Sequence, residues 1–139
     1  MSVPFHYVDL RAFCYETESE ARVEDALRHF IPDDFDLERA ESTGHNGDRI
    51  VVLSARVETA DGMRHVLERL REGADVERLR DELDVRVNEN CALMAHLDKQ
   101  AAYRGDARLG EGVTFRAKVE AYPAKREIAV ENAREALST

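Results

Sequence analysis

Period-two alternation of apolar and polar residues is the feature that most constrains the fold of this 139-residue chain. Three runs place an apolar side chain at every second position: Val3–Tyr15, Arg49–Glu58 and Val113–Tyr122. Because a strand turns successive side chains to opposite faces, such runs are typical of strands with one buried face. The sequence therefore predicts a sheet whose second face stays partly open.

The connections between the runs predict a mostly antiparallel sheet. Asn46-Gly47 separates the predicted strands Phe35–Ser42 and Arg49–Glu58, and both of its residues accept the positive φ that a tight hairpin requires. Val85–Val87 and Cys91–Leu97 form a further strand region that leads into the run ending at Tyr122. Strands that follow one another through hairpins pair in opposite directions.

Amphipathic helices fill the intervals between the strands. A capping box of Thr17 and Glu20 predicts a helix that Pro32 stops. A last helix is expected to begin at Pro123, because proline is well suited to the first turn of a helix.

Two more helices are predicted in the middle of the chain. The first begins at Thr59 or Asp61 and ends at Gly73, and a shorter one carries apolar residues over positions 76–83. Amphipathic helices can cover only one face of a hairpin-built sheet. We therefore predict a single α+β domain over residues 1–139, with a mostly antiparallel sheet and helices packed on one face.

Charge is divided unevenly along the chain. Residues 1–84 hold 21 Asp and Glu against 11 Lys and Arg, a balance of −10, whereas residues 85–139 hold 8 against 9, a balance of +1. All three lysines, Lys99, Lys118 and Lys125, fall within residues 97–126. An acidic protein that gathers its basic groups in one segment offers a place for an anion, although ordinary solvated surface would give the same count.

We expect the net charge of −9 to belong to the habitat of the protein and not to its function. Arg outnumbers Lys by 17 to 3, and the chain has no Trp. We expect such an acidic composition in a halophilic protein, since abundant carboxylates keep proteins apart in concentrated salt and screening weakens their mutual repulsion. The opposite interpretation, an acidic protein that binds basic partners, stays open.

The turn at 98–105 combines residue types that bind RNA. Asp98 can cap a single helical turn, and Gly105 can end it in the left-handed conformation. Alternation places Arg116 and Lys118 on one face of the following strand, which we expect to lie beside this turn. Lys and Arg bind phosphate, Gln and Tyr reach sugar or base edges, and an aromatic ring stacks on a base.

The predicted RNA-binding residues are Lys99, Gln100, Tyr103, Arg104, Arg108, Arg116 and Lys118. Two alternatives stay open for the turn. Tyr103 can be a half-buried packing residue, and Lys99 can be an ordinary helix-surface residue.

The segment Leu97–Leu109, followed by Phe115–Val119 and Tyr122–Glu127, resembles the signature of an archaeal family described as RNA-binding and as a predicted exosome-associated subunit. Phe13–Glu18 also resembles that family's strand-to-helix junction, although Glu16 stands in place of a small residue. The resemblance implies an α+β fold similar to that of the large-subunit ribosomal protein that holds 5S rRNA. It also implies a non-catalytic role in RNA processing or degradation, with RNA and the exosome or other RNA-processing proteins as partners.

The sequence carries no evident catalytic or metal-binding motif. The five histidines lack metal-ligand spacing, Cys14 and Cys91 form no Cys-x-x-Cys pair, and there is no glycine-rich phosphate loop. We therefore expect no enzyme activity, metal or cofactor, although a nuclease with scattered acids and magnesium stays open. Without an apolar run of roughly 18 residues or a signal peptide, we expect a cytoplasmic protein with no membrane partner.

A protein-interaction subunit is the alternative function. In that hypothesis the acidic helices bind a partner, and the basic segment packs or pairs within an oligomer without direct RNA contact. The oligomeric state stays open, with a dimer among the candidates. Copurifying RNA would favour the first hypothesis, and a stoichiometric protein partner without RNA would favour the second.

The halophilic interpretation predicts that the fold loosens as salt is removed. Unscreened repulsion among the carboxylates of residues 1–84 opposes the compact state. The midpoint of thermal unfolding should therefore fall when potassium chloride is diluted from molar to millimolar concentration. A midpoint that stays constant or rises on dilution contradicts the interpretation.

Overall fold

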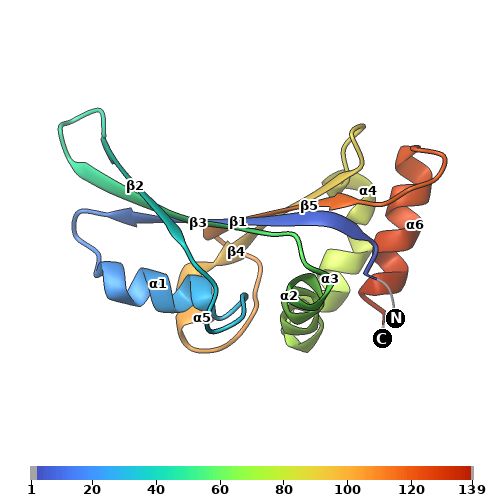
Figure 1. Ribbon diagram of the computed structural model, residues 1–139, viewed down its shortest axis with the longest axis horizontal. Helices are drawn as coiled ribbons and strands as arrows, with labels where there is room; N and C mark the ends of the chain where they lie inside the picture. The colour runs from blue at the N-terminus through green and yellow to red at the C-terminus, as the bar shows by residue number, and fades with distance from the viewer. Residues whose placement is uncertain (1–2, 139) are drawn as a thin grey trace.

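A five-stranded antiparallel sheet forms the centre of the computed structural model, which describes residues 3–138 (Figure 1). The strand order is β2-β3-β1-β5-β4, and all four pairings are antiparallel. The elements in chain order are β1 (Phe5–Tyr15), α1 (Glu20–Arg28), β2 (Glu38–Thr43), β3 (Arg49–Val57), α2 (Ala60–Glu72), α3 (Val76–Asp81), α4 (Leu83–Arg86), β4 (Ala92–Asp98), α5 (Lys99–Tyr103), β5 (Gly112–Val119) and α6 (Arg126–Ala136).

The helices leave one face of the sheet uncovered, which confirms the predicted α+β arrangement. In Figure 1, α1, α2, α3 and α5 lie below the sheet, and α4 and α6 stand at its right-hand end. No helix among the described residues lies over the opposite face of β1, β3 and β5, which is the upper side in this view. We call that side the open face.

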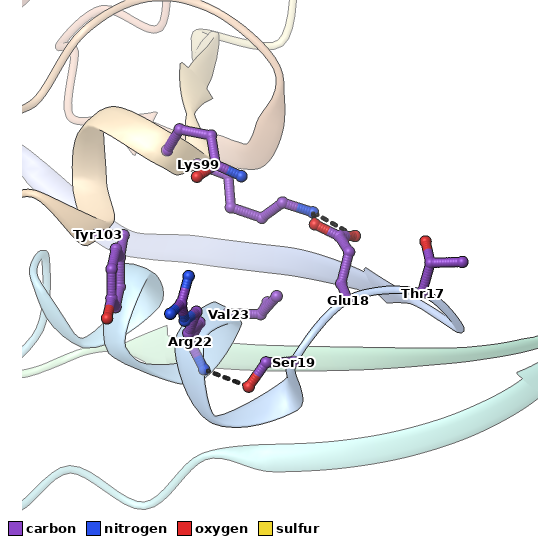
Figure 2. A pocket seen from close by; sticks show the side chains of 8 residues that line it. Thr17, Glu18, Ser19, Arg22, Val23, Lys99 and Tyr103 are labelled. Carbon is purple, nitrogen blue, oxygen red and sulfur yellow. Dashed lines mark hydrogen bonds and ion pairs between the residues drawn. The ribbon is translucent and has the colours of Figure 1, made fainter.

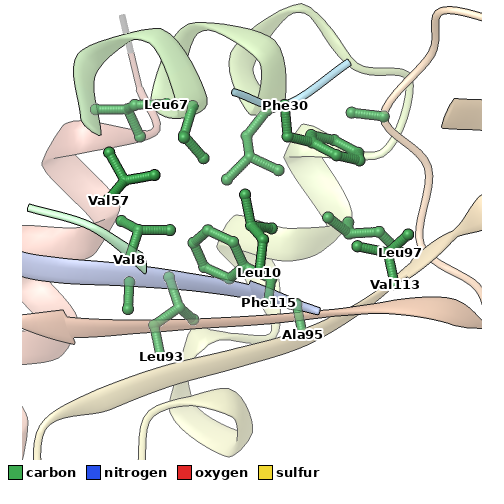
Figure 3. Packing of buried hydrophobic residues seen from close by; sticks show 14 of the residues in the cluster. Val8, Leu10, Phe30, Val57, Leu67, Leu93, Ala95, Leu97, Val113 and Phe115 are labelled. Carbon is green, nitrogen blue, oxygen red and sulfur yellow. The ribbon is translucent and has the colours of Figure 1, made fainter. Parts of the chain in front are cut away.

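The core lies between the sheet and the helices. Val8, Leu10 and Ala12 of β1 are at most 1% exposed, and the alternation predicted from sequence is thereby confirmed. Leu10 pairs with Ala55 of β3 on one side and with Phe115 of β5 on the other. Figure 3 shows the side chains of Val8, Leu10 and Phe115 pointing toward Phe30 and the helices. Burial of this apolar surface is the main free-energy gain that offsets the lost chain entropy.

Two local predictions are wrong. Ser19, not Thr17, caps α1, because residues 15–18 form a turn closed by Glu18 N–H and the Tyr15 carbonyl, and the Ser19 hydroxyl accepts from Arg22 N–H. Residues 85 and 86 belong to α4 rather than to a strand. Their backbone N–H groups bond to the Glu82 carbonyl, while the following residue, 87, makes only an isolated bridge to the edge of β4.

The short helix predicted over 76–83 divides at Glu82 into α3 and α4, whereas the other predicted elements shift only at their ends. The hairpin arm predicted over 35–42 is β2 at 38–43, and the last strand ends at Val119 rather than at Tyr122. Helix α6 begins at Arg126, after Pro123. Thr59 caps α2 as predicted, with its hydroxyl accepting from Gly62 N–H.

Cys14 and Cys91 are buried free thiols. They lie at different places along the sheet, Cys14 opposite Val51 in β1 and Cys91 just before β4. Burial, together with the nearby Glu18 and Glu20 carboxylates, raises the pKa of the Cys14 thiol. This thiol is therefore a packing group in its neutral form.

The assignment of the two faces predicts a large difference between two strand substitutions. Leu10→Ala should lower the free energy of unfolding by about 2–5 kcal/mol, because it leaves a cavity in the core. Met94→Ala, the control on the open face with 40% exposure, should cost less than about 1 kcal/mol. Urea unfolding of both variants measures the difference. Equal losses would contradict the assignment.

Candidate nucleic-acid interface

Arg116 and Lys118 lie on the open face, as the alternation predicts, but not beside the turn at 98–105. Asp98, where that turn begins, pairs with Gly112, whereas Arg116 pairs with Met94 further along β4. At about 3.3 Å per residue, Arg116 lies about 13 Å and Lys118 about 20 Å along the strand from Gly112. Arg116 is exposed, and Lys118 is half-buried with its ammonium group donating to the Asn90 carbonyl.

Lys99 is a structural residue rather than a free surface cation. Its ammonium group donates to the Phe13 carbonyl at 2.9 Å and contacts the Glu18 carboxylate at 2.7 Å, and its side chain is only 11% exposed. The pairing of β1 with β5 reaches only to Ala12, so the Phe13 carbonyl lies where the β5 ladder has ended. The Lys99 ammonium group therefore supplies the hydrogen bond to β1 at the point where β5 no longer pairs with it. This contact joins α5 to β1 and to the start of α1 (Figure 2).

The carboxylate of Glu18 is held in its charged form by this contact. Burial raises its pKa, but the hydrogen bonds from the Lys99 ammonium group and from Tyr15 N–H, together with the charge of Lys99, outweigh burial. The pKa of Glu18 therefore lies below its ordinary value. A lysine that is paired and hydrogen-bonded in this way is costly to disturb.

Gln100 and Tyr103 lie at a recess between α5 and α1, on the helix side of the sheet, and Arg104 is the C-cap residue that follows Tyr103. The recess has a volume of about 480 Å³, and Gln100 and Tyr103 line it together with Ser19 and Arg22. The Arg22 guanidinium lies 5.3 Å from the centre of the Tyr103 ring, which is within cation–π range. Tyr103 is 42% exposed, so it is both a packing residue and an accessible ring.

Arg108 lies in the loop after α5 and has its own carboxylate partner. Its guanidinium donates to Asp106 at 2.7 Å, and this bond holds the pKa of Asp106 below its ordinary value. Asp106 also accepts from Ala74 N–H. The seven predicted residues thus do not form one surface: five belong to α5 and its following loop, while Arg116 and Lys118 belong to the open face.

The open face holds further cations and rings that the sequence prediction of the site missed. Arg11 of β1 pairs with Thr114 of β5 and with Ser54 of β3, so it lies next to the row that contains Arg116. The remaining additions on this face are Tyr7, Phe13 and Tyr15 of β1, Arg56 of β3, and His96 of β4. Alternation alone placed the β1 and β3 side chains on one face of their strands, but only the pairing of the strands gathers them around β5.

Arg56, Asp9 and Tyr7 form an ordered cluster on this face. Arg56 donates to both oxygens of Asp9, at 2.8 and 2.9 Å, and its guanidinium lies 4.1 Å from the centre of the Tyr7 ring. The two hydrogen bonds and the charge of Asp9 raise the pKa of Arg56. A bidentate Arg–carboxylate pair fixes the orientation of the guanidinium plane.

Arg11 and Arg116 are the cations that remain available. Both are exposed, and within residues 3–138 neither forms an ion pair. They line a hollow of about 440 Å³ over the middle of the open face, together with the Asp9–Arg56 pair and Glu38. Three cations, Arg11, Arg56 and Arg116, and two carboxylates, Asp9 and Glu38, line this hollow, a balance of +1 on a protein whose net charge is −9.

Metal ligands are not grouped anywhere in the described part of the chain: residues 3–138 contain no cluster of three or more His, Cys, Asp or Glu side chains that could hold a metal ion. None of the helices in that range is long and apolar enough to cross a membrane.

Comparison with known proteins finds similarity over nearly the whole chain. A family model described as RNA binding matches residues 7–119, from the start of β1 to the end of β5. The RNA-binding protein PAB1135 of Pyrococcus abyssi is 32% identical over 141 residues, covering 94% of this chain and 92% of the relative.

Two solved structures of archaeal proteins have the same fold. Mth689 of Methanothermobacter thermautotrophicus, a DUF54 protein, is 39% identical with a TM-score of 0.81, covering 96% of this chain and 98% of the other. AF2318 of Archaeoglobus fulgidus, from the same DUF54 group, is 26% identical with a TM-score of 0.82, covering 95% and 99%.

The structural role of Lys99 predicts that Lys99→Met destabilises the fold. The variant keeps an apolar stem but leaves the Phe13 carbonyl and the Glu18 carboxylate without their donor, and the free energy of unfolding should fall by about 1–3 kcal/mol at neutral pH. Lys125→Met, at an exposed position, is the matched control and should change little. Equal stability of the two variants would contradict the role.

The same contact predicts a pH dependence. Because the pKa of Glu18 is lower in the folded state, its stabilisation is present above its ordinary value of 4.5 and is lost as the pH falls below that value. The difference in stability between the parent and Lys99→Met should therefore shrink as the pH falls below about 4.5. Thermal unfolding between pH 7 and pH 3 measures it, and a difference that stays constant would contradict this account.

Proposed function

Since the chain belongs to the archaeal RNA-binding family whose model spans its sheet, we propose that this protein binds RNA and that the open face is the binding surface. The name of the P. abyssi relative supports the function. The single observation that carries the choice of surface is the pair of unpaired arginines, Arg11 and Arg116, on adjacent strands of an otherwise acidic protein.

The proposed binding mode combines charge with stacking. Arg11 and Arg116 would contact backbone phosphates, and they lie in neighbouring cross-strand rows so that one strand of RNA can follow them. Phe13 and Tyr15 lie further along the same face of β1 and offer rings on which bases can stack. Arg56 is held by Asp9 and would present an oriented guanidinium plane.

Stacking matters more if the protein works in concentrated salt. Counterion release drives much of the binding of cations to phosphates, and it contributes little when the surrounding salt is already concentrated. An RNA-binding protein in such a medium depends on stacking, hydrogen bonds and shape. The aromatic residues of β1 fit that requirement better than the few lysines of the chain do.

The biological role is proposed on the sequence resemblance alone. We assign the protein to RNA processing or degradation in the cytoplasm, with the exosome as a partner, and to binding rather than catalysis. Incubation of labelled RNA with the protein and magnesium tests the last point, because a nuclease would shorten the RNA. The alternative RNA-binding surface is the one predicted from sequence around α5, which includes Gln100, Tyr103 and Arg104.

Charge removal on the open face should weaken RNA binding. Arg11→Ala and Arg116→Ala should each raise the dissociation constant for single-stranded and structured RNA, and each should reduce the salt slope by about 0.7 for a single strand. Arg134→Ala removes the same charge from an exposed position on α6 and is the matched control. Fluorescence anisotropy at two salt concentrations measures both quantities.

Removal of the ring at Phe13 should have a different signature. Phe13→Leu keeps apolar packing at a half-buried position and should weaken binding by about 1 kcal/mol or more without changing the salt slope.

Tyr103→Ala and Arg104→Ala form the opposing set. If these two weaken binding while the open-face variants bind as the parent does, the RNA lies in the recess between α1 and α5. If no variant loses affinity for any RNA, the interaction-subunit hypothesis replaces RNA binding.

A further inference from the structure

The two edges of the sheet differ in how they are covered. The outer edge of β4 is bonded along much of its length: Leu97 bridges to Leu109, Leu93 bridges to Val87, and Gly110 N–H donates to the His96 carbonyl. Strand β2 pairs only with β3, and all six of its residues are exposed. Among the described strands, β2 alone therefore presents a long unpaired edge. Such an edge is a template for another strand.

The hairpin fixes which backbone groups of β2 point outward. Gly44 N–H donates to the Asp48 carbonyl, and Gly47 N–H donates to the Gly44 carbonyl, so Gly44 and Asp48 form a hydrogen-bonded pair at the turn. In an antiparallel ladder such pairs alternate, so Ala40 bonds inward to Val52 of β3. The N–H and carbonyl groups of the intervening positions 39, 41 and 43 are therefore the ones that face outward.

This alternation restricts how β2 can pair with itself. A two-fold axis must pass through a residue of β2, because an axis between residues would place an inward-bonding residue opposite an outward-bonding one. An axis at Arg39 opposes two arginines, and an axis at Glu41 opposes two glutamates. An axis at Ala40 opposes Arg39 of each copy to Glu41 of the other, and both of these residues have outward backbone groups.

We propose that the protein forms a symmetric dimer in which two β2 strands pair antiparallel about Ala40 and join the sheets into one of ten strands. The occupant of the edge is a second copy because the edge is complementary in charge to itself: two Arg39–Glu41 pairs and two Glu38–Ser42 pairs form across the axis. Arg39 already reaches Glu20 and Glu41 of its own chain, at 2.8 and 2.7 Å, so its guanidinium is held at this edge.

The dimer would double the proposed binding surface. A two-fold axis perpendicular to the sheet keeps both open faces on the same side, so Arg11 and Arg116 of the two copies would belong to one continuous face. At about 4.8 Å between strands, that face would be about 45 Å wide. This consequence rests on the proposed RNA binding, whereas the pairing of the edges does not.

Charge exchange at two positions tests the dimer without RNA. In a homodimer of the Arg39→Glu variant, two carboxylates face each other at each of the two contacts, and in a homodimer of the Glu41→Arg variant two guanidinium groups do. Each variant alone should therefore raise the dimer dissociation constant at least about tenfold. In an equimolar mixture each carboxylate of the first variant faces a guanidinium group of the second, and the dimer should return as a heterodimer. Analytical ultracentrifugation measures mass, and a fluorescent label on one variant identifies the mixed species.

Several outcomes would overturn the dimer. A parent protein that stays monomeric at the highest concentration reached contradicts it, and so does a dimer that both variants retain or that the mixture fails to restore. Arg134→Glu reverses a charge at an exposed position on α6, away from β2, and is the control for charge reversal as such. Thermal unfolding of each variant separates loss of pairing from loss of fold. A dimer that binds no RNA would refute the proposed function and leave the edge pairing intact.

Discussion

The central strand β1 is the constraint on which the rest of the structure depends. It pairs with β3 on one side and with β5 on the other, and its even-numbered residues from Val8 to Cys14 are buried. A slip of one residue in either pairing would turn Arg11 into the core and Leu10 into solvent. The free-energy cost of burying an unpaired arginine makes such a slip prohibitive.

That constraint also creates the candidate interface. Once one face of β1, β3 and β5 is committed to the core, the charged residues of these strands must share the other face. Arg11, Arg56 and Arg116 are far apart in the sequence, and antiparallel pairing brings them into two neighbouring rows. The open face is thus a by-product of building the core, available for an anionic ligand.

The segment Leu97–Leu109, which carries much of the family resemblance, forms a tightly packed connection together with the residues up to Gly112. Asp98 accepts from Ala101 N–H and caps α5, and Gly105 takes a φ of +88°. A side chain at Gly110 would meet Asp98 at 2.7 Å, and one at Gly112 would meet the stem of Lys99 at 2.6 Å. The residues of this segment are therefore needed first for the close packing of the turn. A residue such as Tyr103 can contact a ligand only where the turn is exposed to solvent.

The sequence by itself determined the alternating strands, the hairpin, the helix caps at Thr59 and Asp98, and the burial of one sheet face, because each depends on residues close together in the chain. Tertiary structure decided the rest. Local sequence does not specify that Lys99 would find Glu18, 81 positions away, or that β5 would pair beside β1 so that Arg11 and Arg116 become neighbours. The physical reason is that pairing partners are chosen by burial and hydrogen bonding over the whole sheet, whereas the spacing of residues within one strand fixes only the face on which each lies.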